Sequence, residues 1–355
     1  MLELGVVKVL LPWLTAFLIG LIITPYIIDR LIHYKAWKKK AGNSDGMGGS
    51  GGTPIFNELH KERDVAVPRM GGLVIVISVL ATIAIYWVLS FIVSGGPTGT
   101  LDFLSRNQTW LPVAAFMAGA IVGLIDDLLT INIGEKLGFK GGLPLKYRLL
   151  WASGFAFLAA YWFYTKLEID SVFVPFFGDL TLGFWYVPFF IVTFIAIFST
   201  SNIDGLDGLS GGVMTFVFAA YGAIAYFQDQ INIAAFCFVV VGGILAFTWT
   251  NIPPAKFYMT EVGYNALSFS LAIVAFATDK VLLLPVIAFC LFMTVATTII
   301  QVGSKKLRKG KKVFMVAPIH HHFEAIGWPA HQVVMRYWIV SMIAAVLGVV
   351  LAFTA

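Results

Sequence analysis

Two pairs of aspartates are the residues in this sequence best suited to do chemistry. Asp126 and Asp127 are adjacent in GLIDDLLT. Asp204 and Asp207 lie three residues apart in STSNIDGLDGLSGG, so a helix there would place both on one face. Carboxylates bind Mg²⁺ together with substrate phosphates, and they can also act as bases. Each pair alone could be a solvated helix end or an Asp-capped, glycine-rich turn, but two pairs favour a metal or acid–base site.

A run of imidazoles lies nearer the C-terminus. His320, His321 and His322 are consecutive in APIHHHFEAIGW and are followed by Glu324. Consecutive side chains do not share one helix face, and no cysteine accompanies them, so we do not expect a zinc site. Imidazole donors suit a phosphate instead. The basic run 305–312 just upstream is typical of a cytoplasmic anchor of a membrane helix.

Three single polar residues lie in other connections of the chain. Glu261 is the one acid of NIPPAKFYMTEVGYNAL, and as structure alone it would be a favourable charge in the first helical turn. Tyr258 could anchor at a membrane interface or stack on a base. Lys146 precedes an apolar run, as flanking cations often do. Together with the aspartates and histidines, these residues predict a site for a phosphate-bearing substrate.

Apolar helices must position this site. The chain has 355 residues, of which 59% are hydrophobic and 12% charged, whereas soluble domains have about 25% charged residues. Its apolar runs are about 20 residues long, enough to cross a bilayer core of about 30 Å. We predict an all-α polytopic membrane protein, with residues 1–355 as one domain and a flexible glycine-rich loop at 41–53. We expect about ten spans, at 6–29, 70–93, 110–128, 149–165, 185–201, 211–227, 231–250, 264–278, 281–301 and 333–354.

The charges predict the orientation. An even number of spans places both termini on one side, and all but four of the 24 lysines and arginines then fall on the opposite face. The positive-inside rule makes that face cytoplasmic and puts both termini outside. The histidines and the aspartate pairs share the cytoplasmic face. In a membrane protein, the net charge of +5 therefore points to anionic lipid or phosphate and not to nucleic acid.

The motifs and their order resemble those of the polyprenyl-phosphate N-acetylhexosamine-1-phosphate transferases. Within that superfamily the chain looks most like the phospho-N-acetylmuramoyl-pentapeptide transferases, over nearly its whole length. The most specific pieces are APIHHHFEAIGW followed by VVMRYW, then DGLDGL, then the DD pair. The resemblance implies an Mg²⁺-dependent enzyme on the cytoplasmic face of the bacterial plasma membrane. There undecaprenyl phosphate attacks UDP-N-acetylmuramoyl-pentapeptide and gives lipid I and UMP for peptidoglycan synthesis, on which cell shape and division depend.

The resemblance also implies roles for individual residues. Asp126 matches an acid that deprotonates the lipid phosphate or assists the metal. The residues implied to be catalytic are Asp126, Asp127, Asp204 and His321. Those implied to bind substrate are Lys146, Asn202, Asp207, Tyr258, His320 and His322, with Asp207 and Tyr258 near uracil. Those implied to bind Mg²⁺ are Asp126 and Glu261.

Several positions depart from the family pattern. Glu261 stands where the family has aspartate, Thr130 stands where it has lysine, and the stretch before DGLDG is shortened around Asn202. VPRMGG at 67–72 is closer to the sister N-acetylglucosamine-1-phosphate transferases. These departures leave open a donor such as UDP-N-acetylglucosamine and a catalytically inactive relative. Polar groups near the membrane ends also leave open a transporter or channel, in which such groups are common. Whether the chain forms a homodimer also stays open.

Overall fold

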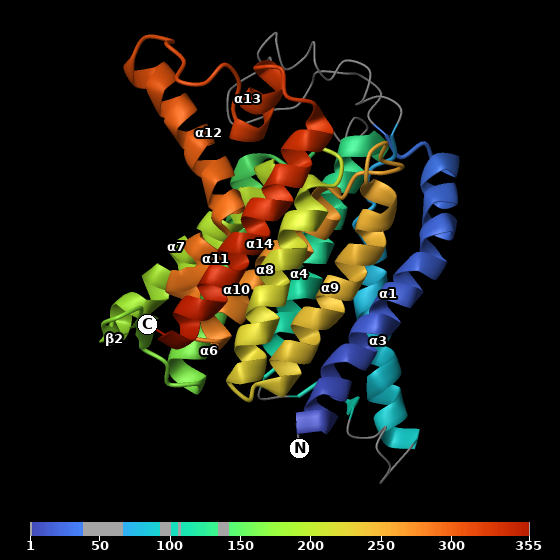
Figure 1. The fold of residues 1–355 in the computed structure, drawn as a ribbon, viewed down its shortest axis with the longest axis vertical. Helices are drawn as coiled ribbons and strands as arrows, with labels where there is room; N and C mark the ends of the chain where they lie inside the picture. Colours follow the sequence, from blue (N-terminus) through green and yellow to red (C-terminus); the bar gives the residue numbers. More distant parts are fainter. Residues whose placement is uncertain (1, 38–66, 93–100, 106–107, 134–141, 355) are drawn as a thin grey trace.

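Long helices form one bundle in the computed structural model of the chain (Figure 1). The structure describes residues 2–37, 67–92, 101–105, 108–133 and 142–354. The predicted glycine-rich loop at 41–53 lies outside these residues. The elements of the first half are α1 (Leu2–His33), α3 (Leu73–Ile92), α4 (Trp110–Leu128), the π-helix η2 (Leu129–Ile133), α6 (Leu145–Lys166), β1 (Ser171–Val174) and β2 (Gly178–Thr181).

The second half of the chain is again mostly helical. Its elements are the 3-10 helix η3 (Gly183–Trp185), α7 (Tyr186–Phe198), the 3-10 helix η4 (Ser199–Ile203), α8 (Leu209–Phe227), α9 (Ile231–Asn251), α10 (Thr260–Ala277), the 3-10 helix η5 (Val281–Leu283), α11 (Leu284–Ile287), α12 (Phe289–Leu307), α13 (Ile319–Ala325) and α14 (Ala330–Thr354).

The predicted all-α membrane architecture is confirmed. Eight helices of the described chain are long and apolar enough to cross a membrane, or up to nine if one bent pair counts as a single span. The segment predicted at 149–165 is helical, as part of α6, but it is not among the eight. Trp151, Tyr161, Trp162 and Tyr164 lower its mean hydropathy because these rings are amphipathic. The count of about ten therefore stays a prediction.

The bent pair corrects one predicted span. We expected a continuous helix at 281–301, but the chain is helical over 281–287 and again over 289–307, with 83° between the two pieces. The break falls at Ala288, whose ψ of 34° lies outside the helical range. As a result α12 leaves the bundle at an angle, as Figure 1 shows.

A short antiparallel hairpin was not predicted. Strands β1 and β2 pair with Ser171 opposite Thr181 and Val174 opposite Gly178. The hairpin lies between α6 and α7, in a connection for which the sequence analysis predicted no regular structure. Gly178 has a φ of 81°, which a glycine adopts without strain at the turn.

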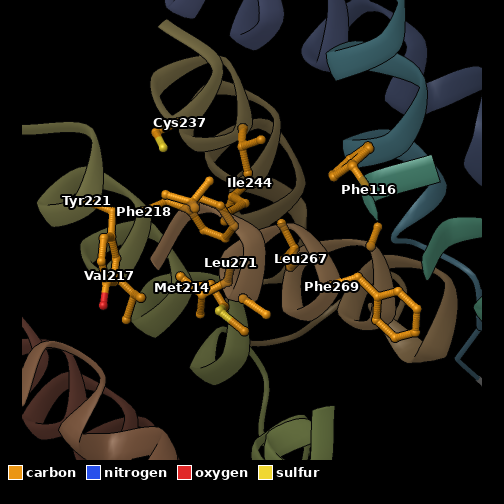
Figure 2. Close-up of a cluster of buried hydrophobic side chains, with 14 of the residues drawn as sticks. Phe116, Met214, Val217, Phe218, Tyr221, Cys237, Ile244, Leu267, Phe269 and Leu271 are labelled. Carbon is orange, nitrogen blue, oxygen red and sulfur yellow. The ribbon is translucent and has the colours of Figure 1, made fainter. Parts of the chain in front are cut away.

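Helix α10 lies at the centre of the bundle. Of its residues, 89% are buried, more than in any other candidate span of the described chain. Figure 2 shows part of the surrounding core, in which Phe116 of α4 and Phe218 of α8 lie around Leu267 and Phe269 of α10. A helix that is apolar on all sides is stable when it is enclosed in this way. The N-terminus of α10 consequently lies at one end of the bundle, surrounded by the ends of other helices.

Two glycines bring the backbones of α4 and α10 into contact. A Cβ atom on Gly119 would lie 2.2 Å from the Asn265 carbonyl oxygen, and one on Gly123 would lie 2.1 Å from the Glu261 carbonyl oxygen. Small residues four apart allow this kind of close helix approach in membranes. The contact sets the height of α4 against α10, and it places the end of α4 beside the start of α10.

We expect Gly123→Ala to destabilise the protein, because the added methyl group meets backbone that cannot turn aside. An overpacking cost of about 1–3 kcal/mol should lower the melting temperature in detergent by several degrees. Gly154→Ala on α6 is the matched control, since a Cβ atom there has nothing within 4 Å. That control should be neutral or slightly stabilising, and equal melting temperatures for the two variants would contradict the contact.

Candidate active site

Polar residues from separate segments gather at the end of the bundle where α10 begins. They come from the end of α4, the start of α6, the turn before α3, the turn between η4 and α8, and the short helix α13. In Figure 1 this is the end that carries α13, opposite the start of α1. Motifs that lie far apart in the sequence thus come together at this end of the bundle, where hydrogen bonds connect them.

Thr260 joins the two aspartate pairs. Its hydroxyl donates to Asp127 Oδ2 at 2.6 Å, and its backbone N–H donates to Asp204 Oδ2 at 3.0 Å. The same hydroxyl accepts from the Met70 N–H at 3.0 Å, which ties the VPRMGG turn to the start of α10. Thr260 has a φ of 54°, an unusual conformation for a β-branched residue. The structure thus brings both predicted pairs to one residue that the sequence analysis did not single out.

Asp127 has its acceptor sites occupied by the protein. Its Oδ2 also accepts from the Val262 N–H at 2.9 Å, so this carboxylate caps the first turn of α10 from a neighbouring helix. Its Oδ1 lies 3.3 Å from Arg69 Nη2, and the side chain is fully buried. These bonds give Asp127 a structural role, while its predicted catalytic role stays a prediction.

Asp126 and Glu261 have acceptor capacity left. Asp126 is buried, accepts from the Leu143 N–H at 2.7 Å, and lies within electrostatic reach of Glu261 and Arg148. Glu261 Oε1 lies 2.5 Å from Arg148 Nη2. Glu261 Oε2 is buried and has no hydrogen-bond partner in the part of the chain that the structure describes. A buried carboxylate oxygen without a donor suits a cation.

These two acids fit the incomplete ligand set that Mg²⁺ uses. Within the described ranges, no three His, Cys, Asp or Glu side chains gather closely enough to hold a metal ion alone. Mg²⁺ is usually bound by one or two carboxylates, with waters and substrate phosphates as the other ligands. Asp126 and the free oxygen of Glu261 therefore match the predicted metal site in number and kind.

The two aspartates of DGLDG face different surroundings. Asp204 Oδ1 accepts from the Ser210 hydroxyl at 2.7 Å. Burial raises the pKa of the Asp204 carboxyl above its usual range, although its hydrogen bonds from Ser210 and Thr260 oppose the rise. Asp207 Oδ2 accepts from the Ala255 N–H at 3.1 Å, and Asp207 borders a cavity of about 290 Å³ at the start of α14. The segment is a turn, with Gly208 at a φ of 79°, so the two aspartates do not share a helix face.

The histidine run packs against this turn. A Cβ atom on Gly205 would lie 2.7 Å from His321 Nε2 and 2.8 Å from His320 Nε2, so only glycine allows the approach. His321 Nδ1 lies 2.8 Å from Glu324 Oε2, which orients the ring. His322 is turned differently and accepts from the Met315 N–H through Nδ1 at 3.3 Å. The first two histidines therefore face the residue next to Asp204.

Three of the predicted substrate-binding residues lie outside this bonded cluster. Lys146 is exposed, with Nζ 4.8 Å from the centre of the Tyr147 ring. Asn202 is exposed on η4. Tyr258 is half-buried, and its carbonyl accepts from the Gly71 N–H at 2.7 Å. These three residues can bind substrate only if part of the substrate extends from the acids to their side chains.

The two arginines that contact the acids were seen in the sequence as cations near a phosphate, but they were not among the predicted site residues. Arg69 and Arg148 stand next to apolar runs, where cations are ordinary, and their partners lie 58 and 113 residues away in the chain. Spacing along one sequence carries no signal at that range. The motif VPRMGG was noted for its resemblance, and the bond from Arg69 to Asp127 gives it a physical function.

We expect Asp127→Asn to lower stability, because the amide nitrogen would face either the donors at Thr260 and Val262 or the guanidinium of Arg69, and the negative charge would be lost in both cases. Hydrogen bonds to a charged group contribute about 1.5–3 kcal/mol, so the melting temperature in detergent should fall measurably. Asp126→Asn is the matched control, because the Asp126 carboxylate accepts one hydrogen bond, from the Leu143 N–H, in the described part of the chain. If the two variants melt alike, Asp127 does not have the capping role.

Comparison with known proteins agrees with the resemblance. Residues 109–279 match the family described as Glycosyl transferase family 4. A phospho-N-acetylmuramoyl-pentapeptide-transferase of Chloroflexus aurantiacus is 33% identical in an alignment of 301 residues that covers 81% of this chain and 77% of the relative. Proteins of the same name from Lactiplantibacillus plantarum and Listeria welshimeri are each 32% identical. These matches cover 96% and 82% of this chain, and 98% and 86% of the respective relatives. The chain belongs to the phospho-N-acetylmuramoyl-pentapeptide-transferase family.

Proposed function

We propose that the protein transfers phospho-N-acetylmuramoyl-pentapeptide from UDP-N-acetylmuramoyl-pentapeptide to undecaprenyl phosphate, giving lipid I and UMP. Its similarity to proteins named phospho-N-acetylmuramoyl-pentapeptide-transferase supports the reaction. The observation that carries the proposal is the junction at Thr260, which bonds Asp127 and Asp204. Both aspartates lie within electrostatic reach of Glu261, whose Oε2 has no hydrogen-bond partner among the described residues. Phosphoryl transfer depends mainly on alignment and charge neutralisation, which such a cluster can provide.

In this reaction an oxygen of the lipid phosphate bonds to the sugar-linked phosphorus. The bond from that phosphorus to the bridging oxygen breaks, and UMP leaves. Asp126 is the acid that accepts a proton from the lipid phosphate, because it is buried and its carboxylate accepts just one hydrogen bond, from the Leu143 N–H, within the described ranges. Glu261 Oε2 and Asp126 would hold Mg²⁺, which when bound supplies positive charge against the diphosphate. His320 and His321 face the same turn as Asp204 and can donate to a phosphate.

We further propose ten crossings of the bacterial plasma membrane, with the site on the cytoplasmic face. In Figure 1 the start of α1 and the end of α14 lie at the same end of the bundle, as an even number of crossings requires. Counting α6 and the bent pair as crossings brings the candidates to an even number. The exposed cations of 305–312 and Lys146 lie on connections that belong to the site's face.

A second donor has one observation in its favour. VPRMGG is closer to N-acetylglucosamine-1-phosphate transferases, and its arginine contacts Asp127 inside the site. The same chemistry on UDP-N-acetylglucosamine is therefore the alternative. The two donors share the uridine diphosphate and differ in the lactyl-peptide arm, so only a direct comparison separates them.

A donor competition assay tests the proposal. Purified protein with Mg²⁺, undecaprenyl phosphate and radiolabelled UDP-N-acetylmuramoyl-pentapeptide should give an extractable lipid product and an equal amount of UMP. An excess of unlabelled UDP-N-acetylglucosamine should leave that yield largely unchanged, whereas strong competition would favour the alternative donor. Absence of turnover with both donors would refute the proposed chemistry.

We expect Asp126→Asn to reduce kcat by roughly 10²–10⁴-fold, the usual contribution of a positioned acid–base group. The variant keeps the volume of the side chain, so its melting temperature should stay close to that of the wild type. Initial rates and melting curves on the same preparations check both statements. Wild-type turnover in the variant would remove Asp126 from the reaction.

A further inference from the structure

The ion pair between Arg148 and Glu261 has one hydrogen bond where two are possible. The Nη2–Oε1 contact of 2.5 Å is its one hydrogen bond. Arg148 Nε and Glu261 Oε2 are both buried, and neither has a hydrogen-bond partner among the residues that the structure describes. An arginine and a carboxylate commonly form two parallel bonds, which would satisfy both atoms. The pair therefore leaves one buried donor and one buried acceptor without partners in the described part of the chain.

The surroundings hold the pair in this arrangement. The Phe198 ring lies 5.8 Å from Arg148 Cζ, and Asp126 and Asp127 are within electrostatic reach of the guanidinium. Glu261 is fixed at the first turn of α10, next to the Thr260 junction. Two acids beside one pair favour an added cation, and the unfilled N–H favours an added anion. A single ligand that carries both charges close together satisfies the two groups at once.

We infer that a divalent cation chelated by a diphosphate completes the pair, with Glu261 Oε2 facing the cation and Arg148 Nε–H donating to a phosphate oxygen. The inference rests on the proposed function and adds Arg148 as a substrate-binding residue. The existing Nη2–Oε1 bond then orients the Glu261 carboxylate, so that its second oxygen faces the cation. It also explains why a glutamate suits this position, since its extra methylene reaches Arg148.

Arginine is required for this arrangement and lysine does not replace it. The planar guanidinium presents Nη2 and Nε along one edge, so it can bond a carboxylate and a phosphate together. A lysine ammonium keeps the charge without that edge. Arg148→Lys therefore separates the directional bonds from the positive charge.

Binding of Mn²⁺ and UDP tests the inference without turnover. Electron paramagnetic resonance of Mn²⁺ follows the ternary complex, and UMP binding without metal serves as the reference for the nucleoside end. We expect Arg148→Lys to weaken Mn²⁺–UDP binding at least tenfold and to change UMP binding less than twofold. Glu261→Gln should do the same, and the double variant should be no more than twofold weaker than the weaker single variant. Arg308→Lys, an exposed arginine at the end of α12, is the matched control and should bind like the wild type.

Several results would overturn the inference. One is wild-type affinity for Mn²⁺–UDP in both Arg148→Lys and Glu261→Gln, with only a lower melting temperature, because the pair would then be structural. Another is a wild type that binds UDP equally well with and without Mn²⁺. If Arg148→Lys does not fold, Arg148→Gln replaces it, because Glu261→Gln alone tests the cation side and not the bond from Arg148. A wild type that binds Mn²⁺–UDP tightly but transfers nothing in the donor assay would refute the proposed reaction and support this binding site.

Discussion

The contact between the backbones of α4 and α10 is the constraint on which the site depends. Gly119 and Gly123 let the two helices touch, so the aspartates that end α4 reach the first turn of α10. A separation larger by one methyl group would move Asp127 away from Thr260 and Val262, which it now bonds. Apolar packing fixes the position of α10 along the axis of the bundle, and that packing therefore also determines where the acids lie.

The carboxylates at this junction differ in how many hydrogen-bond donors they have, and this difference separates their functions. Asp127 accepts from two groups through one oxygen and pairs with Arg69 through the other, so its charge serves the fold. Asp126 and Glu261 are less completely bonded, although burial makes an unfilled carboxylate oxygen unfavourable. That imbalance is what a site for a cation and a phosphate requires, because the ligand supplies the missing partners. One structural acid thus supports two acids that stay available.

The sequence predicted the parts of this structure that depend on local pattern. Apolar runs located the helices, and the DD, DGLDG and histidine motifs do meet, through Thr260 and Gly205. The bend at Ala288 and the hairpin at 171–181 were missed, since neither interrupts the apolar pattern strongly. The pairing of Arg148 with Glu261 was not predicted for another reason, because the two residues lie 113 positions apart and only the folded helices bring them together. Which of two neighbouring aspartates is structural was equally invisible in the sequence, because it depends on the donors of another helix.

The left-handed backbone at Thr260 restricts which residues can occupy that position. Its φ of 54° favours glycine or asparagine, yet its hydroxyl must both donate to Asp127 and accept from the Met70 N–H. Glycine would relax the chain and abolish both bonds, whereas valine would keep the crowding and lose them too. Only serine offers the hydroxyl without the branched carbon, so Thr260→Ser is the one exchange that keeps both hydroxyl bonds at the position that joins the two aspartate motifs.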